Sequence, residues 1–277
     1  MDMSIVIRCW DDERVFKCVD SIDEDVEVIV STSENPKFQG KLAARGINYC
    51  LVPRGNLSIV SNVGFAATKY NKVLITDSDT TFEKGCIRKM HDALDEHRVV
   101  RAKLRFKHRA DMPFSRIVAE ARDFVNSLPV VYTPGIAVRK DILPDIGGFL
   151  FNDPVPFAVD ADLNYRIRKA RISVRYLDDA VIYHDAESLR HDINAAFRIG
   201  RGCMVSAVHL SGHDGSGGQR PRIIARELKG VKPQHFREIL HKRGLPILSY
   251  QLLWDLLFYG GMIHQSFISR LPGGKPT

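Results

Sequence analysis

The sequence predicts an α/β protein with a mixed, mostly parallel sheet that is flanked by helices and followed by a C-terminal helical extension. Over the first hundred residues, short runs rich in β-branched residues alternate with helical patterns, as in βαβ units around a parallel sheet. After His184 the strand pattern stops and apolar residues recur at helical spacing. The length of 277 residues allows one large domain or two small ones.

Strands are expected where apolar, β-branched residues run together between turn residues. The first such runs are Ser4–Arg8, Val26–Ser31, Ile47–Val52 and Lys72–Thr76. Helical spacing between them predicts helices over Asp12–Ile22, Pro36–Arg45 and Leu57–Tyr70. Later strands, again separated by helical segments, are expected at Val99–Arg105, Val130–Val138, Ile172–Leu177 and Ala180–His184.

The chain after His184 is predicted to be mostly helical. Leu189–Leu210 has helical spacing, and residues 211–221 (SGHDGSGGQRP) predict a flexible, glycine-rich loop. Leu245–Ile263 is apolar over nineteen residues, with Asp255 as its only charge. Because a mid-helix carboxylate is costly inside a bilayer, we expect an in-plane amphipathic helix or a buried core helix there, and not a membrane span.

The charge of the chain is concentrated in one segment. The net charge is +7, and residues 219–243 carry eight basic residues against two acidic ones. The rest of the chain is therefore close to neutral, which argues against a nucleic-acid partner. Five cysteines without a CxxC pair favour neither a disulfide framework nor a zinc site. Together with the lack of a signal-peptide pattern, this predicts a cytoplasmic protein.

The sharpest local signal is VLITDSDTTF, an apolar strand that ends in Asp77 and Asp79. Ligands of open α/β sheets bind at the carboxyl ends of the strands. Two carboxylates on one tight turn can share a divalent cation such as Mg²⁺ or Mn²⁺, and that cation can hold a diphosphate. Two solvated turn aspartates would give the same pattern, so the motif alone leaves both interpretations open.

Two further signals follow in the second half of the chain. Asp160 and Asp162 open a segment of helical spacing, where acidic residues can also merely complement the helix N-terminus. The run DAVIYHD ends a strand at His184, whose imidazole could be a metal ligand, although this run on its own favours a surface histidine.

Taken together, the order of these motifs resembles the glycosyltransferase family 2 enzymes, which have the GT-A fold. The resemblance runs from about Ser4 to about Leu210, through IVIRCWDDERVFKCVDSI, SNVGFAATKYNKVLITDSDT, TPGIAVRKDILPDIGGF, VDADLNYRIRKA and FRIGRG. It implies a GT-A-like catalytic domain over residues 1–190, with a nucleotide-sugar half (1–105) and an acceptor half (106–190). Residues 191–277 would form the helical extension.

The resemblance also implies roles for single residues. Asp79 would bind Mn²⁺ or Mg²⁺ together with Asp77 and His184, and Asp160 would be the general base. Gly147, Gly148 and Asp162 would lie on the acceptor side. The residues implied to bind the donor, for which a UDP-sugar is the first expectation, are Arg8, Trp10, Asp12, Glu34, Arg54, Asp77, Ser78 and Arg201.

Several positions depart from the family pattern. Arg8 stands where the family usually has proline, Ser61 replaces an arginine, and Val159 replaces the first acid of the catalytic pair. These departures leave the implied metal ligands and base in place.

Two other functions fit parts of the sequence. DSDTT also fits the DxDx(T/V) motif of haloacid-dehalogenase-like phosphatases, with Asp77 as nucleophile and Asp79 as acid. In that class the motif normally lies near the N-terminus, whereas three expected strands precede it here. A non-catalytic binding or membrane-adaptor protein with the same fold is the third hypothesis.

The partners expected from the sequence are a nucleoside-diphosphate sugar and a sugar, lipid-linked or small-molecule acceptor. The basic segment and the apolar helix after it, over residues 219–271, suit a peripheral site on the anionic inner face of a membrane. The same helix could instead pack on the catalytic domain or join two copies of the chain.

Overall fold

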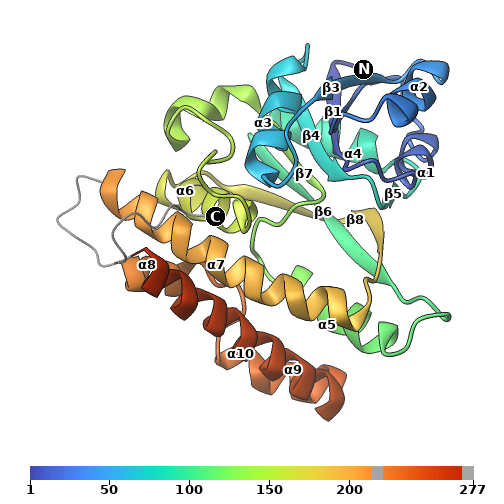
Figure 1. Cartoon of the computed structure of the whole chain (residues 1–277). Helices are drawn as coiled ribbons and strands as arrows, with labels where there is room; N and C mark the ends of the chain where they lie inside the picture. Colours follow the sequence, from blue (N-terminus) through green and yellow to red (C-terminus); the bar gives the residue numbers. More distant parts are fainter. Residues whose placement is uncertain (214–220, 270–277) are drawn as a thin grey trace.

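The computed structural model describes residues 1–213 and 221–269, which form a sheet covered by helices on both faces and a group of C-terminal helices beside it (Figure 1). The sheet order is β3-β2-β1-β4-β7-β6-β8-β5. β7 runs antiparallel to β4 and β6, and β5 antiparallel to β8, whereas the other neighbours are parallel. The predicted mostly parallel sheet with helical flanks and a C-terminal helical extension is confirmed. The strands are β1 (Met3–Arg8), β2 (Glu27–Thr32), β3 (Asn48–Leu51), β4 (Lys72–Asp77), β5 (Thr80–Phe82), β6 (Val99–Lys107), β7 (Ile136–Arg139) and β8 (Val174–Asp185).

Helices cover both faces of this sheet. One face carries α1 (Val15–Asp20), α2 (Pro36–Ala44) and α4 (Cys86–Glu96), whose apolar residues form one buried cluster with β1 and β6. The other carries α3 (Leu57–Ala67), the 3₁₀ helix η1 (Lys140–Ile146) and α6 (Val159–Lys169). Burial of both faces explains why the central strands read as continuous apolar runs and not as alternating ones.

Three sequence expectations about strands were wrong. The strand expected over Val130–Val138 begins only at Ile136, because Pro134 has no N–H to donate and Gly135 has a φ of +90°. The pair expected at 172–177 and 180–184 is the single strand β8, which pairs with β6 on either side of a register shift. The strand β5 was missed, since three residues are too few to show a pattern.

Helix boundaries also differ from the sequence expectations. The helix expected over Asp12–Ile22 is limited to α1, and the helix expected to end at Tyr70 ends at Ala67. Residues 211–213, expected in a flexible loop, belong to α7, and Pro221 begins α8. The rest of that expected loop, 214–220, lies outside the described residues.

The C-terminal helices pack together against the sheet domain. α7 (Leu189–His213), α8 (Pro221–Leu228), α9 (Gln234–Arg243) and α10 (Leu245–Ile268) bury apolar side chains in one cluster with α5 (Ser115–Asn126) and α6. Within the described part of the chain, none of the helices has the length and apolar character needed to cross a membrane.

Two glycines let α7 and α10 cross at close range. A Cβ on Gly200 would lie 1.9 Å from the carbonyl oxygen of Phe258, and one on Gly261 would lie 2.1 Å from that of Phe197. Gly202 approaches the carbonyl oxygen of Phe157 in the same way, at 2.3 Å. The glycines of FRIGRG therefore permit the close packing that holds α7 against α10 and against the segment before α6.

The lone carboxylate of the apolar stretch, Asp255, is buried in α10 and paired. Lys229 Nζ donates to Asp255 Oδ2 at 2.5 Å, and Gln251 Nε2 donates to Asp255 Oδ1 at 2.8 Å. Lys229 is only 6% exposed, so one of the basic residues of the segment 219–243 does not lie on the surface where the sequence placed it. Separating α8 from α10 would leave each charge without its partner, which is costly in a buried position. The ion pair therefore holds the end of α8 to α10.

Candidate active site

The candidate site lies at the carboxyl ends of β1 and β4, where the loop after β1 faces the turn between β4 and β5. The parallel ladder sets Arg8 opposite Asp77, and the pairing of Thr80 with His184 brings the end of β8 beside that turn. A cavity of about 620 Å³ opens there. Its lining includes seven of the residues expected to bind a donor or a metal: Arg8, Trp10, Asp12, Arg54, Asp77, Ser78 and Asp79.

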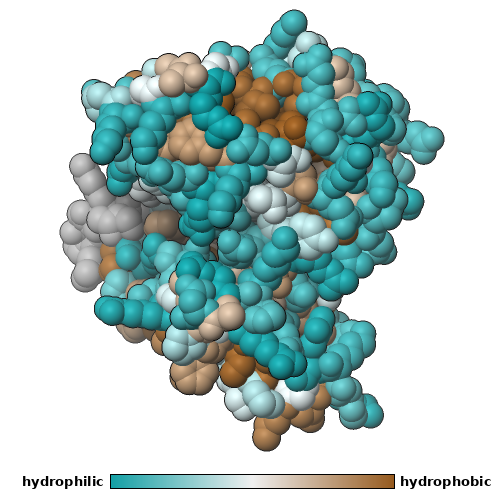
Figure 2. Space-filling view, turned by 90° about the vertical axis from the view of Figure 1, so that its right-hand side faces the viewer, coloured by the Kyte–Doolittle hydropathy of each residue, from teal (hydrophilic) through white to brown (hydrophobic). Residues whose placement is uncertain are grey.

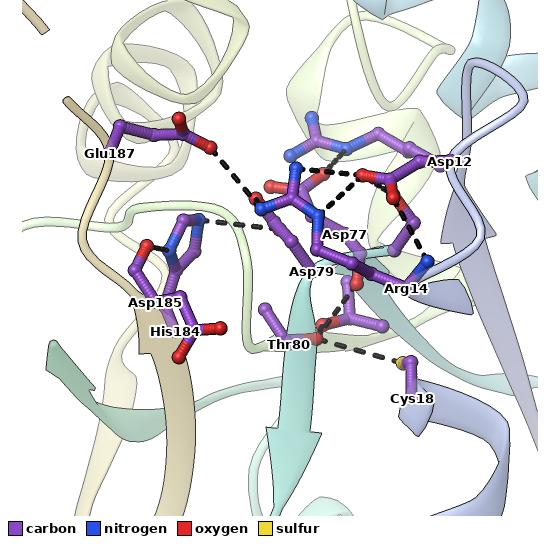
Figure 3. A network of polar contacts seen from close by, with 12 residues as sticks. Asp12, Arg14, Cys18, Asp77, Asp79, Thr80, His184, Asp185 and Glu187 are labelled. Carbon is purple, nitrogen blue, oxygen red and sulfur yellow. Dashed lines mark hydrogen bonds and ion pairs between the residues drawn. The ribbon is translucent and has the colours of Figure 1, made fainter. Parts of the chain in front are cut away.

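The three predicted metal ligands lie close together (Figure 3), and two of them, Asp77 and Asp79, line this cavity. Asp77, Asp79 and His184 each offer an atom, and these atoms all lie within 4.8 Å of one another. His184 Nδ1 lies 2.6 Å from the carbonyl oxygen of Asp185, which can only accept, so Nδ1 carries a proton. In the neutral imidazole Nε2 then holds a lone pair, the state in which histidine binds metals.

The residues present fit a divalent cation. His184 Nε2 faces Asp79 Oδ1 at 3.3 Å, and this oxygen is buried and accepts no hydrogen bond from the described residues. A lone pair and a carboxylate oxygen that face each other both gain from a cation between them. Burial raises the pKa of Asp79, and the positive charge that His184 carries when it is protonated only partly offsets this.

Arg14 is a site residue that the sequence did not reveal. Its guanidinium lies 2.7 Å from Asp12 Oδ2, 3.5 Å from Asp79 Oδ2 and 3.4 Å from Glu187 Oε1 (Figure 3). Burial alone would lower the pKa of Arg14, but the three carboxylates raise it. Burial alone would raise the pKa of Asp12, but the hydrogen bonds from Arg14 lower it. Arg14 therefore adds a fixed positive charge beside the proposed ligands.

Arg8 supplies a second positive charge from the floor of the site. Its Nε donates to Asp77 Oδ1 at 2.7 Å, and the side chain is almost fully buried. Its Nη1 is buried and has no hydrogen-bond partner among the described residues. A buried, unsatisfied guanidinium N–H is costly, so this group is suited to receive an anionic oxygen of a ligand.

Asp160 lies in the first turn of α6, at the border of a second cavity of about 280 Å³. Its Oδ1 accepts a hydrogen bond from the Ala161 backbone N–H at 2.9 Å. Burial raises the pKa of Asp160, and the charge of Arg8 opposes that rise. The two cavities share Asp77, Glu187 and His191 in their linings, so they meet beside the carboxylate cluster.

The other residues expected to bind a donor are divided between the cavity and its surroundings. Arg54 lines the cavity and is held by an ion pair with Asp11 and a 2.9 Å hydrogen bond to Ser33 Oγ. Ser78 also lines it, with Oγ 3.4 Å from Asp12 Oδ2. The lining of the cavity includes neither Glu34, which is exposed, nor Arg201.

Arg201 faces α10, where its Nε donates to Gln265 Oε1 at 3.1 Å. Arg198, one helical turn earlier on α7, lines the cavity instead. Of the two arginines of the motif FRIGRG, Arg198 therefore lines the cavity and Arg201, the one expected to bind the donor, does not.

The residues expected on the acceptor side lie beneath the site. Asp162 is fully buried and accepts hydrogen bonds from Arg166 Nε at 2.7 Å and from Ser206 Oγ at 2.8 Å. Arg166 in turn donates to backbone carbonyl oxygens of the segment 146–150. Gly147 and Gly148 are exposed, with φ of +99° and +86°. Asp162 therefore anchors this loop through Arg166, and neither cavity includes these three residues in its lining.

The sheet order and a carboxylate site at the ends of β1 and β4 define the GT-A type of fold. No family model and no curated protein sequence matches the chain. Among solved structures, S. aureus TarS 1-349 in complex with UDP-GlcNAc is similar, with a TM-score of 0.58 and 17% identity, over 95% of this chain and 82% of that one.

Two other structures of S. aureus TarS are also similar. TarS 1-349 gives a TM-score of 0.56 at 16% identity, over 95% of this chain and 81% of that one. The longer TarS structure gives a TM-score of 0.56 at 16% identity, over 99% of this chain and 50% of that one. At such identities the similarity concerns the fold, and the fold implied by the sequence resemblance is confirmed.

Proposed function

We propose that this protein is a metal-dependent, inverting glycosyltransferase that moves a sugar from a nucleoside-diphosphate sugar, with UDP as the first choice, to an acceptor hydroxyl. The observation that carries the proposal is the meeting of two cavities at Asp77, Glu187 and His191. One cavity is lined by Asp77 and Asp79 together with Arg8 and Arg14, and the other by His184 and Asp160. The GT-A fold, and the UDP-GlcNAc that the TarS complex contains, support this reading.

In the proposed reaction Asp160 takes the proton of the acceptor hydroxyl. The acceptor oxygen forms a bond to the anomeric carbon as the bond from that carbon to the diphosphate oxygen breaks, and the diphosphate leaves with the electron pair. One displacement inverts the anomeric centre. The buried Asp160, with its raised pKa, is a stronger base than an exposed aspartate once it is ionised.

The diphosphate would be held by charges of this chain. Asp77, Asp79 and His184 would hold the divalent cation, Mn²⁺ or Mg²⁺. That cation would supply charge neutralisation for the leaving diphosphate. Arg8 would direct its unpaired Nη1 to a phosphate oxygen, while Trp10 would stack on the base at the cavity rim.

The phosphatase alternative is less well supported. A nucleophilic Asp77 would have to attack phosphorus, but its Oδ1 is bound by Arg8. Asp160 and the second cavity would also have no role in that chemistry. A non-catalytic binding protein remains the alternative that the first measurement separates.

That measurement is the unfolding temperature in the presence of UDP, GDP, dTDP and CDP, each with and without Mn²⁺. A ligand that binds the native state raises the apparent stability by mass action, by about 2.7 kcal/mol at a hundred times its Kd. We expect one of the four nucleotides to raise the unfolding temperature, and only in the presence of Mn²⁺. UDP is the first candidate. If none of the four does so, the transferase proposal fails, and assays on phosphoester substrates become the next step.

We also propose that the protein sits as a peripheral protein on anionic membrane, at its cytoplasmic face. Five exposed apolar residues recur at helical spacing along α10: Leu252, Leu256, Tyr259, Ile263 and Phe267. The neighbouring α9 exposes Arg237 and Lys242, which complement anionic lipid. Figure 2 shows hydrophobic residues at the lower end of the molecule as well as near its top, and Figure 1 places α9 and α10 at the height of the lower group.

The membrane proposal predicts that Leu256→Asp with Ile263→Asp abolishes sedimentation with phosphatidylserine-containing liposomes. Both side chains are more than half exposed, so the fold should tolerate the change. Leu51→Asp is the matched control, since Leu51 is 50% exposed on β3. The proposal is wrong if the unmodified protein does not sediment. A dimer that the double variant dissociates would assign this face to a second copy.

A further inference from the structure

The second cavity is largely apolar, which the proposed reaction does not by itself require. It lies among α5, α7 and α10, which pack against one another below the sheet (Figure 1). Its lining includes polar residues such as Asp160, Arg122, Asp192, Lys229 and Gln251, but its walls are otherwise largely apolar. These apolar walls include Phe106, Val118, Val125, Cys203, Leu228 and Phe258, which come from β6, α5, α7, α8 and α10.

The wall that α10 contributes to this cavity contains an unsatisfied donor. Trp254 is only 8% exposed and lines the cavity, and its Nε1 is buried with no hydrogen-bond partner in the described part of the chain. The Arg122 guanidinium lies 4.6 Å from the Trp254 ring and completes that wall. A buried indole N–H normally finds an acceptor, so an unpaired one at a cavity wall is suited to an oxygen of a ligand.

The charges around the cavity compensate one another. Arg122 Nε lies 3.6 Å from Asp192 Oδ2, and Lys229 is paired with Asp255. The cavity therefore does not require a charged ligand. It offers apolar contact over most of the ligand surface and two buried donors that have no hydrogen-bond partner among the described residues, Trp254 Nε1 and Arg122 Nε.

We infer that this cavity takes a small, neutral acceptor that has a hydroxyl group at one end, an apolar body and a hydrogen-bond-accepting oxygen at the other. The hydroxyl would lie at Asp160, the body against Val118 and Phe258, and the distal oxygen at Trp254 Nε1. The inference rests on the proposed function, because Asp160 is the group that would activate the hydroxyl.

Size and chemistry select this class over a glycan chain. A volume of about 280 Å³ lies just below the usual range for small-molecule sites and fits about one ring with a short substituent. A glycan would need hydrogen-bond partners for many hydroxyl groups, and hydroxyls buried against apolar walls are costly. The apolar walls instead gain from each buried carbon of an aryl or alicyclic alcohol.

The two tryptophans of the chain allow a direct test, because each reports on one cavity. Trp10 lines the first cavity and Trp254 the second, and the sequence contains no other tryptophan. In the Trp10→Phe variant we expect benzyl alcohol and cyclohexanol, but not maltotriose, to change the fluorescence of Trp254 in a saturable way. Val118→Phe in the same background should narrow the cavity and raise the half-saturation concentration about tenfold, a loss of about 1.4 kcal/mol. Val208→Phe, at an exposed site on α7, should leave the half-saturation concentration unchanged.

A second measurement tests the distal hydrogen bond. We expect 4-methoxybenzyl alcohol to bind more tightly than the similarly shaped 4-ethylbenzyl alcohol in calorimetric titrations, and Trp254→Phe to remove that preference. The inference is overturned if no alcohol saturates the Trp254 signal, if maltotriose does so as well, or if Trp254→Phe keeps the preference.

A test with UDP separates this inference from the function on which it rests. UDP with Mn²⁺ is titrated into Trp254→Phe, where Trp10 is the reporter. Binding of UDP without binding of alcohols would overturn the acceptor inference alone. If UDP does not bind, the transferase proposal fails, and the acceptor inference fails with it.

Discussion

The Asp160→Asn variant is expected to bind UDP and Mn²⁺ as the unmodified protein does and to lose about 10²- to 10⁴-fold in turnover, the usual contribution of a general base. Asn keeps the shape of the side chain and can still accept the hydrogen bond from the Ala161 backbone. It cannot take a proton. Turnover is measured as release of UDP from the UDP-sugar with a saturating acceptor, and UDP affinity by thermal shift.

The same substitution is expected to raise the stability of the protein at neutral pH. Burial raises the pKa of Asp160 in the folded protein above its ordinary value of 3.8. The folded state then binds more protons than the unfolded state as the pH rises from 3.8 to that raised pKa, so stability falls across this window and stays lower above it. Asn removes this cost, so the variant should unfold at a higher temperature.

The pH dependence of turnover follows from the same shift. The base must be ionised, so kcat/KM should fall as the pH falls through the raised pKa of Asp160, at a higher pH than for an exposed aspartate. The contrasting variant is Asp162→Asn, which should lower the stability because the buried Arg166 loses its charged partner. Near-normal turnover in Asp160→Asn would remove Asp160 as the base.

The sequence predicted the chemical residues of the site better than the elements that bring them together. Asp77, Asp79, Asp160 and His184 each follow or open a recognisable element, so their types and order were visible. The strand β5 was not visible, yet its pairing with β8 sets Thr80 opposite His184 and so places Asp79 beside the imidazole. Such a pairing depends on tertiary contacts that a run of three residues does not encode.

The residues missed at the site share one property: their role comes from partners far away in the chain. Arg14 lies two residues after Asp12, but its contact with Glu187 spans 173 positions. Lys229 and Asp255 were seen as a surface cation and an isolated helical carboxylate, whereas their pairing buries both. A charge pattern along the sequence cannot show which charges compensate one another in space.

The Asp79→Asn variant is expected to lose the Mn²⁺-dependent part of nucleotide binding altogether. Asp79 Oδ1 is the buried oxygen that faces His184, and the amide that replaces the carboxylate provides a much weaker ligand and no negative charge. UDP should then raise the unfolding temperature no more with Mn²⁺ than without it. The measurement is the thermal shift with UDP over a series of Mn²⁺ concentrations.

The control for Asp79→Asn comes from the second group of possible ligands in the described chain, His91, Asp92 and Asp95. Here the ammonium of Lys72 already lies 2.6 Å from Asp95 Oδ1 and 3.2 Å from His91 Nε2, in the position a metal would need. Asp95→Asn should therefore leave the Mn²⁺-dependent shift unchanged. If both variants lose the shift, Mn²⁺ acts outside the candidate site, and if neither does, Asp79 is not a ligand. Loss in Asp79→Asn alone would tie the nucleotide and the metal to the same place, since Asp79 Oδ1 is a buried carboxylate oxygen with no hydrogen-bond partner among the described residues.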